Sequence, residues 1–239
     1  HIHFPATKKS AINLKKLGEY PNNIYFTGCP SIDLIKRANL KIDKNFVKKY
    51  APSGVGTDIN FLKKYIVILQ HPVTTEYGSG LRQIKSTIDA VKDLNTQIVW
   101  LWPNVDAGSD DISKGLRIFR ETYKGKKIKF YKNFDPENYL KLINNAACMV
   151  GNSSSALREG SYLGIPAVNI GTRQDGRERG KNVISVGYNS SKIRSAIISR
   201  MKSKKFKSNK LYGNGNAGKK IAEILSKVDV KIQKKLNYK

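Results

Sequence analysis

The residue types best suited to chemistry form a turn of small polar side chains at residues 151–155. Ser153, Ser154 and Ser155 follow an apolar run typical of a buried strand and lead into an expected helix at 155–163. The first N–H groups of a helix have no partner within the helix, and its dipole places partial positive charge there. A strand that leads through such a turn into a helix is therefore typical of a phosphate-binding site.

Glu159 and Arg173 stand where they could contact the same ligand. Glu159 lies one helical turn beyond the serines, where a carboxylate can accept hydrogen bonds from sugar hydroxyls. Arg173 follows a second apolar run, 166–170, and its guanidinium could pair with the same phosphate. The alternative is a capped helix with an acidic residue on its surface. The strand–turn–helix context favours a nucleotide-binding site over this alternative.

Three more candidates follow expected strands. His71, before Pro72, either marks the end of a strand or holds a phosphate or transfers a proton, because imidazole titrates near neutral pH. Asn104 could contact substrate, or its loop could only cap the next helix. Phe134 is free to stack on a base, although a lone phenylalanine is more often a core residue.

The elements that must position these residues alternate between strands and helices. Apolar runs predict strands at 24–27, 65–70, 97–102, 127–131, 147–150, 167–170 and 183–186. Helical periodicity predicts helices at about 7–18, 31–38, 81–94, 110–123, 135–145, 155–163, 190–201 and 217–236. This alternation predicts an α/β fold, a Rossmann-like doubly wound parallel sheet covered on both faces. Ligands bind at the carboxyl ends of the strands in such sheets, so the polar candidates are expected to form one site.

Residues 41–64 have the weakest pattern. Pro52, Gly54 and Gly56 interrupt this segment, and we expect a mobile surface excursion. The full length of 239 residues fits one large α/β domain or one and a half smaller ones.

The charge balance is strongly basic, with 44 Lys and Arg against 18 Asp and Glu and a formal net charge of +26. Such a balance is usual for nucleic-acid binding. The lysines recur on most expected helices without forming one stripe, so we expect a solvated surface and no nucleic-acid partner. No apolar run approaches the ~20 residues that span a bilayer, so no membrane partner is expected. Cys29 and Cys148 have no metal-ligand spacing and are expected to be reduced core residues of a cytoplasmic protein.

Several motifs resemble those of the UDP-N-acetylglucosamine 2-epimerases. They lie at residues 27–33, 71–76, 103–109 and 148–182. The His-Pro-Val-Thr-Thr run and the Gly-Thr-Arg-Gln-Asp-Gly-Arg run look most like the hydrolysing branch, which releases N-acetylmannosamine for sialic acid synthesis. The resemblance covers nearly the whole chain apart from 41–64 and the lysine-rich tail.

The resemblance implies two Rossmann-like domains that face each other across a cleft, as in the GT-B glycosyltransferases. Residues 1–30 would be the end of the first domain and the hinge, and 31–200 the UDP-binding domain. Residues 201–239 would be a basic tail and a C-terminal helix that crosses back to the first domain. The family also implies a homo-oligomer, and we expect neither a metal nor a cofactor.

The resemblance also implies a role for each candidate residue. UDP would be held by Asn104, Asn133, Phe134, Ser153, Ser154, Ser155, Glu159 and Arg173. Within this set the serines would hold the diphosphate, Glu159 the ribose hydroxyls, and Phe134 with Asn133 would border the uracil. Some relatives carry histidine at the position of Asn133. His71 would be catalytic, beside the diphosphate and the sugar.

The implied reaction eliminates UDP to give a glycal, to which water adds with inversion at C2. The family's catalytic carboxylates belong to the first domain, which this sequence does not contain. The chain alone is therefore expected to bind UDP weakly and to turn over nothing.

Three alternatives remain open at this point. The substrate could be a UDP-2,4-diacetamido-trideoxyhexose of the legionaminic acid route. The chain could be half of a GT-B glycosyltransferase, although the 171–177 run is not associated with transferases. It could also be a non-catalytic basic binding module, whose affinity for nucleic acid would fall steeply with salt.

Overall fold

The computed structural model describes residues 1–123, 125, 127–229, 233 and 237. The strands are β1 Val55–Gly56, β2 Tyr65–Leu69, β3 Gln97–Leu101, β4 Ile128–Tyr131, β5 Cys148–Gly151, β6 Ala167–Ile170 and β7 Val183–Val186. The α-helices are α1 Lys8–Lys16, α2 Pro30–Arg37, α3 Lys44–Tyr50, α4 Gly80–Val91, α5 Ser109–Thr122, α6 Pro136–Asn145, α7 Glu159–Leu163, α8 Ser190–Lys202 and α9 Ala217–Leu225. Short 3-10 helices are η1 Pro21–Asn23, η2 Thr74–Glu76 and η3 Ser154–Ala156.

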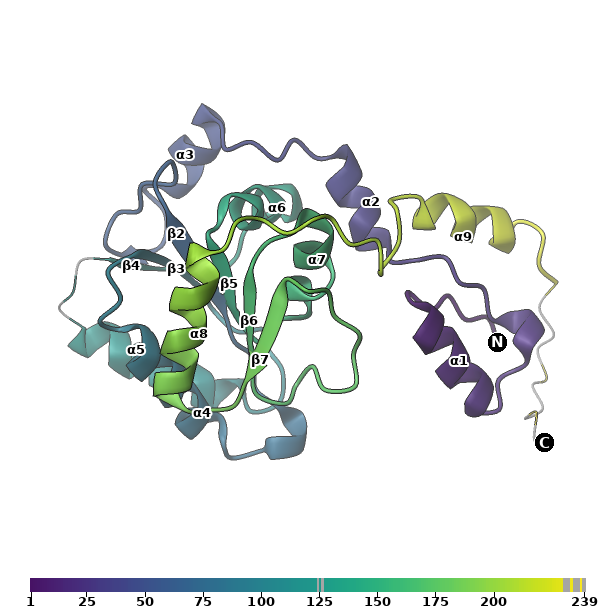
Figure 1. The fold of residues 1–239 in the computed structure, drawn as a ribbon, viewed down its shortest axis with the longest axis horizontal. Coiled ribbons are helices and arrows are strands. Elements are labelled where there is room, and N and C mark those ends of the chain that lie inside the picture. The colour runs from purple at the N-terminus through teal and green to yellow at the C-terminus, as the bar shows by residue number, and fades with distance from the viewer. Residues whose placement is uncertain (124, 126, 230–232, 234–236, 238–239) are drawn as a thin grey trace.

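Within the described part of the chain, the strands form one sheet in the order β1-β4-β3-β2-β5-β6-β7 (Figure 1). All neighbouring pairs are parallel except β1 with β4, which is antiparallel. The strand order reverses between β2 and β5, which is the topological switch point where open α/β sheets bind their ligands. The prediction of a Rossmann-like doubly wound parallel sheet is confirmed.

The central strands are mostly apolar because both faces of the sheet are covered there. Ile66 and Ile68 of β2 belong to a core cluster with residues of α4, α5 and α8. Tyr65 and Val67, on the opposite face, belong to a cluster with residues of α3 and α6. Successive side chains of a strand point to opposite faces, so a strand that is covered on both faces contributes to two cores and reads as a mostly apolar run.

The prediction of a strand at 24–27 is wrong. Ile24 forms only an isolated parallel bridge with His3, outside the named strands. This segment lies with α1 and α9 to one side of the sheet in Figure 1, where the large sheet offers no neighbouring strand. An extended apolar segment becomes a strand only when a second strand pairs with it along its length.

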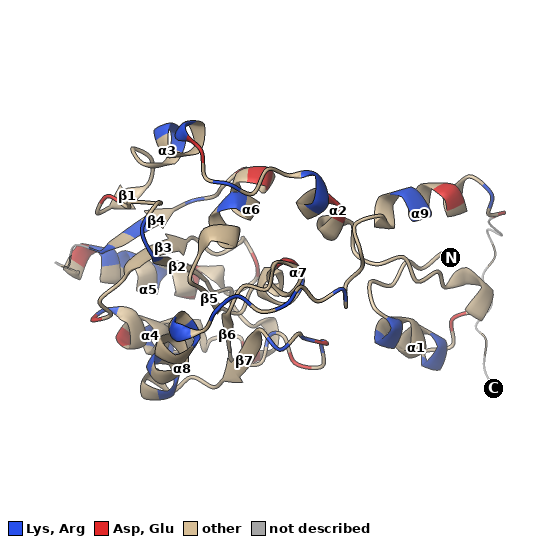
Figure 2. Cartoon of the chain, turned by 45° about the horizontal axis from the view of Figure 1, so that its top comes forward, with Lys and Arg blue, Asp and Glu red and all other residues tan. Residues whose placement is uncertain are grey.

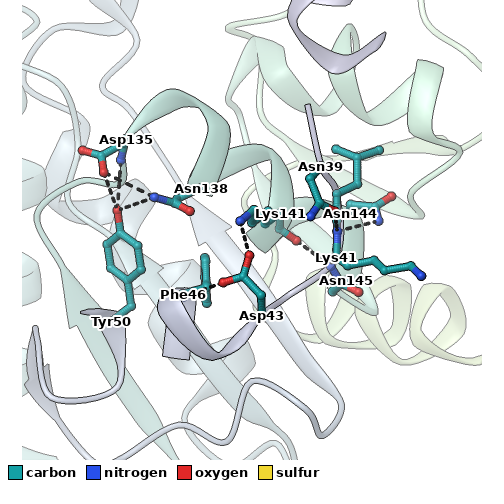
Figure 3. Close-up of polar contacts among 11 residues, drawn as sticks. Asn39, Lys41, Asp43, Phe46, Tyr50, Asp135, Asn138, Lys141, Asn144 and Asn145 are labelled. Carbon is teal, nitrogen blue, oxygen red and sulfur yellow. Dashed lines mark hydrogen bonds and ion pairs between the residues drawn. The ribbon is translucent and has the colours of Figure 1, made fainter. Parts of the chain in front are cut away.

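The prediction of a mobile surface excursion at 41–64 is also wrong, since this segment contains α3 and β1 and packs on the sheet. Phe46 and Tyr50 are buried, and Tyr50 stacks on Phe134 at 4.3 Å between ring centroids. Figure 3 shows the polar contacts that join this segment to α6. Asp43 caps α3 by accepting from the Phe46 N–H at 2.8 Å, and it also accepts from Lys141 Nζ at 2.6 Å.

The described part of the C-terminal region has a shorter helix than expected. α9 ends at Leu225, and part of the expected 217–236 helix lies outside the described residues. Asp33 of α2 holds the start of α9 by accepting from the backbone N–H groups of Ala217 and Gly218, at 2.9 and 2.7 Å. The basic segment before α9 is packed on the Rossmann-like domain, where the Phe206 N–H donates to the carbonyl of Gly164 at 2.8 Å. The expected domain boundaries stay predictions.

The positive charge is spread over the molecule. Figure 2 shows Lys and Arg on most helices, including α1, α3, α5, α8 and α9, rather than along one stripe. Among the described residues no helix is long and apolar enough to cross a membrane. Cys29 and Cys148 are both buried and both free, which agrees with the expectation of reduced core residues.

Candidate functional site

The switch point is held together by the side chain of Asn152. β2 and β5 end side by side, with Leu69 in register with Gly151. Asn152 follows Gly151 and is fully buried. Its Oδ1 accepts from the backbone N–H of His71 at 2.7 Å, and its Nδ2 donates to the carbonyl of His71 at 2.8 Å. One amide thus continues the pairing of β2 and β5 beyond the sheet and fixes His71. Asn152 was part of the predicted turn but not among the predicted site residues, although its place directly after a strand-ending glycine was a usable signal.

His71 is a neutral imidazole with a defined tautomer. Its side chain is buried, and its Nδ1 accepts from the backbone N–H of Asn104 at 3.2 Å. Because Nδ1 is an acceptor, the ring proton lies on Nε2. Burial lowers the pKa of His71 to about 4, Arg173 acts in the same direction, and Asp106 opposes them. At neutral pH His71 is therefore a hydrogen-bond donor through Nε2 rather than a cation.

Arg173 reaches the same switch point from the loop after β6. Its Nη1 donates to the carbonyl of Asn152 at 3.3 Å, and its Nη2 forms an ion pair with Asp106 Oδ2 at 3.3 Å. Gln174, which is buried, donates to the same carbonyl at 2.7 Å. The structure thus brings together the loops after β2, β3, β5 and β6. Asp106 and Gln174 were not among the predicted site residues.

A pocket of about 400 Å³ opens beside Arg173. It is lined by Pro72, Val73, Thr74, Thr75, Asp106, Ala107, Thr172 and Arg173. Hydroxyl, backbone and guanidinium groups therefore face one space at the carboxyl ends of the strands, with Asp106 as the acidic group. Such a lining suits an anion that forms an ion pair with Arg173 in place of Asp106.

The serine turn differs from the expected helix at 155–163. Residues Ser154–Ala156 form the 3-10 helix η3, and α7 begins only at Glu159. Ser153 caps η3 by accepting from the Ser155 N–H at 3.3 Å. Ser155 is buried, and its Oγ shares hydrogen bonds with Tyr139 at 2.6 Å and Ser153 at 3.0 Å. The dipole of a long helix therefore does not reach the serines, and an anion there would depend on the hydroxyls and N–H groups of the turn.

Glu159 is a buried carboxylate with spare hydrogen-bonding capacity. It is 8% exposed, and its Oε2 accepts no hydrogen bond within the described residues. The Arg158 Nε lies 3.7 Å from this oxygen and balances its charge. Tyr139 is close to both Glu159 and Ser155, so the carboxylate and the serine turn belong to one cluster. Buried carboxylates normally have hydrogen-bond donors, so this unpartnered oxygen makes Glu159 a candidate ligand contact.

The ring of Phe134 lies in the core rather than on the surface. Its side chain is 4% exposed and packs against Tyr50 and Tyr131. The prediction that this ring is free to stack on a base is therefore wrong, and the core alternative holds. Asn133 is exposed, and its Oδ1 accepts from the Phe134 N–H at 2.8 Å. Aromatic residues of the misjudged segment 41–64 cover Phe134, and this cover could not be foreseen while that segment was expected to lie on the surface.

Among the described residues, no three or more His, Cys, Asp or Glu side chains lie together so that they could hold a metal ion. Burial raises the pKa of the Cys148 thiol to about 12, so this thiol is neither an anion nor a nucleophile at neutral pH. At the switch point, neutral His71 and Arg173 are both able to donate hydrogen bonds to an anion.

Acidification is expected to destabilise the fold through His71. Between pH 6.5 and about 4 an unfolded histidine binds a proton that folded His71 excludes. Because the unfolded state binds more protons in this window, the free energy of unfolding falls as the pH falls, by at most on the order of 3 kcal/mol. Denaturant unfolding of the parent and of His71→Gln, at about pH 7 and about pH 4.5, measures this contribution. The variant should have the shallower pH dependence, and equal slopes would contradict a buried neutral imidazole.

Sequence comparison identifies relatives over nearly the whole chain. The family described as UDP-N-acetylglucosamine 2-epimerase matches residues 1–226. A UDP-N,N'-diacetylbacillosamine 2-epimerase (hydrolyzing) of Legionella pneumophila is 29% identical over 233 residues, which are 98% of this chain and 59% of the relative. A UDP-N-acetylglucosamine 2-epimerase of Neisseria meningitidis is 28% identical over 229 residues, 95% of this chain and 58% of the relative. The chain thus spans less than two thirds of the length of either relative.

Solved structures share the fold. The Methanocaldococcus jannaschii UDP-GlcNAc 2-epimerase in complex with UDP-GlcNAc and UDP matches with a TM-score of 0.74 at 19% identity, over 94% of this chain and 60% of that one. The Neisseria meningitidis UDP-GlcNAc 2-epimerase bound to UDP-GlcNAc matches with a TM-score of 0.73 at 19% identity, over 95% and 62%. These matches confirm the Rossmann-like half of a GT-B-like fold. Together with the match over residues 1–226, they identify the chain as a member of the UDP-N-acetylglucosamine 2-epimerase family.

Proposed function

We propose that this chain is the UDP-binding half of a hydrolysing UDP-N-acetylglucosamine 2-epimerase. The observation that carries the proposal is the position of Arg173, which lies beside neutral His71 at the switch point of the sheet. A guanidinium beside a neutral hydrogen-bond donor suits the diphosphate of a sugar nucleotide, both bound and departing. The names of the Legionella and Neisseria relatives support the assignment to a 2-epimerase.

Each part of UDP has a proposed partner. The diphosphate would lie between Arg173 and the turn of Ser153 and Ser154, and the ribose hydroxyls would donate to Glu159, whose buried Oε2 accepts no hydrogen bond from the described residues. Asn133, with its exposed side chain, remains a candidate for the uracil edge. Ser155 is engaged with Tyr139 and would act by shaping the turn.

The proposed reaction divides its chemistry between two halves of the enzyme. A base outside this chain removes the C2 proton, and the C1–O bond breaks with its electron pair leaving on UDP. The neutral His71 would donate through Nε2 to an oxygen of the departing diphosphate, while Arg173 offsets its growing charge. Water then adds its proton at C2 and its hydroxyl at C1 of the glycal, giving free N-acetylmannosamine.

A second substrate is supported by one observation. The Legionella relative, which is 29% identical, is a hydrolysing epimerase of UDP-N,N'-diacetylbacillosamine. The same UDP-binding residues would hold that nucleotide, because its UDP portion is unchanged. The groups that distinguish the two sugars lie at C4 and C6, away from the nucleotide.

Product analysis tests the proposed function. A protein that unites this chain with a first domain is incubated with UDP-N-acetylglucosamine or UDP-N,N'-diacetylbacillosamine. We expect free UDP and a free 2-epimerised sugar from one of these substrates, and no turnover by this chain alone. A product that is still a UDP-sugar would contradict the hydrolysing assignment. Turnover by this chain alone would contradict the division of chemistry between the halves.

A further inference from the structure

The loop that carries Arg173 contacts three neighbouring loops, through one backbone carbonyl and two carboxylates. Gln174 donates to the carbonyl of Asn152, and Arg173 pairs with Asp106. In the third contact, Thr172 Oγ1 donates to Glu76 Oε1. The first two contacts involve groups at the switch point itself, whereas Glu76 comes from the end of η2.

Both oxygens of Glu76 are engaged by protein groups. Glu76 Oε2 accepts from Gln83 Nε2 at 2.5 Å. Gln83 belongs to α4 and is fully buried, so its amide depends on Glu76 for this bond. The backbone of Glu76 is fixed as well, since its N–H donates to Val73 at 2.9 Å and its carbonyl accepts from Ser79 at 3.1 Å. Glu76 is therefore held by a bond to α4 and by its own backbone turn, and its Oε1 accepts from the neighbouring loop.

The hydrogen bond between Glu76 and Thr172 restrains the residue directly before Arg173. The chain turns at Gly171 with φ +75°, directly before Thr172 and Arg173. A bond at Thr172 limits the direction in which the chain leaves this turn and thus where the guanidinium can reach. Thr172 and Arg173 also line the same pocket as Thr74 and Thr75, which precede Glu76.

We propose that Glu76 is a positioning residue. It holds the 171–173 loop against the loop after β2 and so orients the side chain of Arg173 toward the pocket that this arginine lines. Glu76 does not bind the anion, because both its oxygens are occupied and its charge would repel a phosphate. The identity of the anion as UDP rests on the proposed function. The positioning of the loop does not.

The test uses Thr172→Val, which removes the hydroxyl and leaves the Glu76–Gln83 bond intact, with Thr172→Ser as the matched control. Glu76→Ala and the double variant Glu76→Ala/Thr172→Val complete a double-mutant cycle. Hydrogen exchange of the amides at 171–177 reports local opening of the loop. Exchange of the amides of β2 and α4 reports opening of the surrounding fold. Titration with UDP measures the affinity, which reports whether Arg173 is positioned to bind the nucleotide.

We expect Thr172→Val and Glu76→Ala each to speed exchange of the loop about tenfold and to weaken UDP binding by a similar factor, without adding in the double variant. Thr172→Ser, which keeps the hydroxyl, should leave amide exchange of the loop at the rate of the parent. Unchanged loop exchange, additive effects, or equally faster exchange in β2 and α4 would overturn the proposal. If the parent does not bind UDP, non-additive exchange in the loop would still support the positioning role, and the proposed function alone would fail.

Discussion

Gly151→Ala is expected to lower the free energy of unfolding by more than about 4 kcal/mol, because the substitution forces a methyl group into the backbone of the neighbouring strand. A Cβ at Gly151 would lie 2.1 Å from the carbonyl oxygen of Leu69, and φ at Gly151 is +120°. Neither the clash nor the backbone strain can be relieved by a flexible side chain. Leu69 and Gly151 are in register across β2 and β5, so any relief would separate the two strands at the switch point.

The effect would reach the site as well as the fold. Asn152 follows Gly151, and its two bonds to His71 require the strand ends to stay together. Denaturant unfolding measures the stability, with Gly187→Ala as the control because a Cβ at Gly187 meets no atom within 4 Å. A loss of unfolding free energy below about 1 kcal/mol, or a loss equal to that of the control, would contradict this expectation. It would show that β2 and β5 can separate at the switch point at little cost in stability.

Arg173→Ala is expected to weaken UDP binding by about 10- to 100-fold, the range for losing charged hydrogen bonds to a phosphate. The effect has two parts. The variant loses the guanidinium, and it leaves the carboxylate of Asp106 facing the anion without its partner. Arg173→Ala/Asp106→Asn separates these parts, since the second change removes the repulsion and should recover some of the affinity.

Arg177→Ala is the control for loss of charge alone, because Arg177 is exposed on the same loop region. Titrations of the variants under one salt concentration measure the affinities, since screening changes any such interaction. Equal weakening by Arg173→Ala and Arg177→Ala would mean that UDP responds only to the general positive charge of the chain.

The sheet was predictable from the sequence because its strands are buried on both faces. Each predicted strand from 65–70 onward corresponds to a strand in the structure with ends shifted by no more than one residue. His71 and Arg173 were predictable for a related reason. Polar residues directly after apolar strands must lie at the carboxyl edge of a parallel sheet, and the topology brought these two to the same switch point.

The remaining site features depend on contacts between residues far apart in sequence. Asn152 binds the backbone of a residue 81 positions away, and no local pattern distinguishes this from a simple turn. Phe134 is covered by aromatic residues of α3, whose Pro and Gly neighbours indicated a loop. The low pKa of His71 follows from its burial, which a strand-end position did not reveal. Residues Ser154–Ala156 form a 3-10 turn instead of the start of a helix because the side chain of Ser153 caps this turn by accepting from the Ser155 N–H.

Calorimetric titration of the purified chain with UDP, at moderate salt and beside Arg173→Ala, tests whether this chain alone contains a specific UDP-binding site at the switch point of its sheet. We expect weak, saturable binding to one site that the substitution abolishes or weakens about 10- to 100-fold. A folded chain that shows no binding, or that binds UDP as well after the substitution, would contradict such a site.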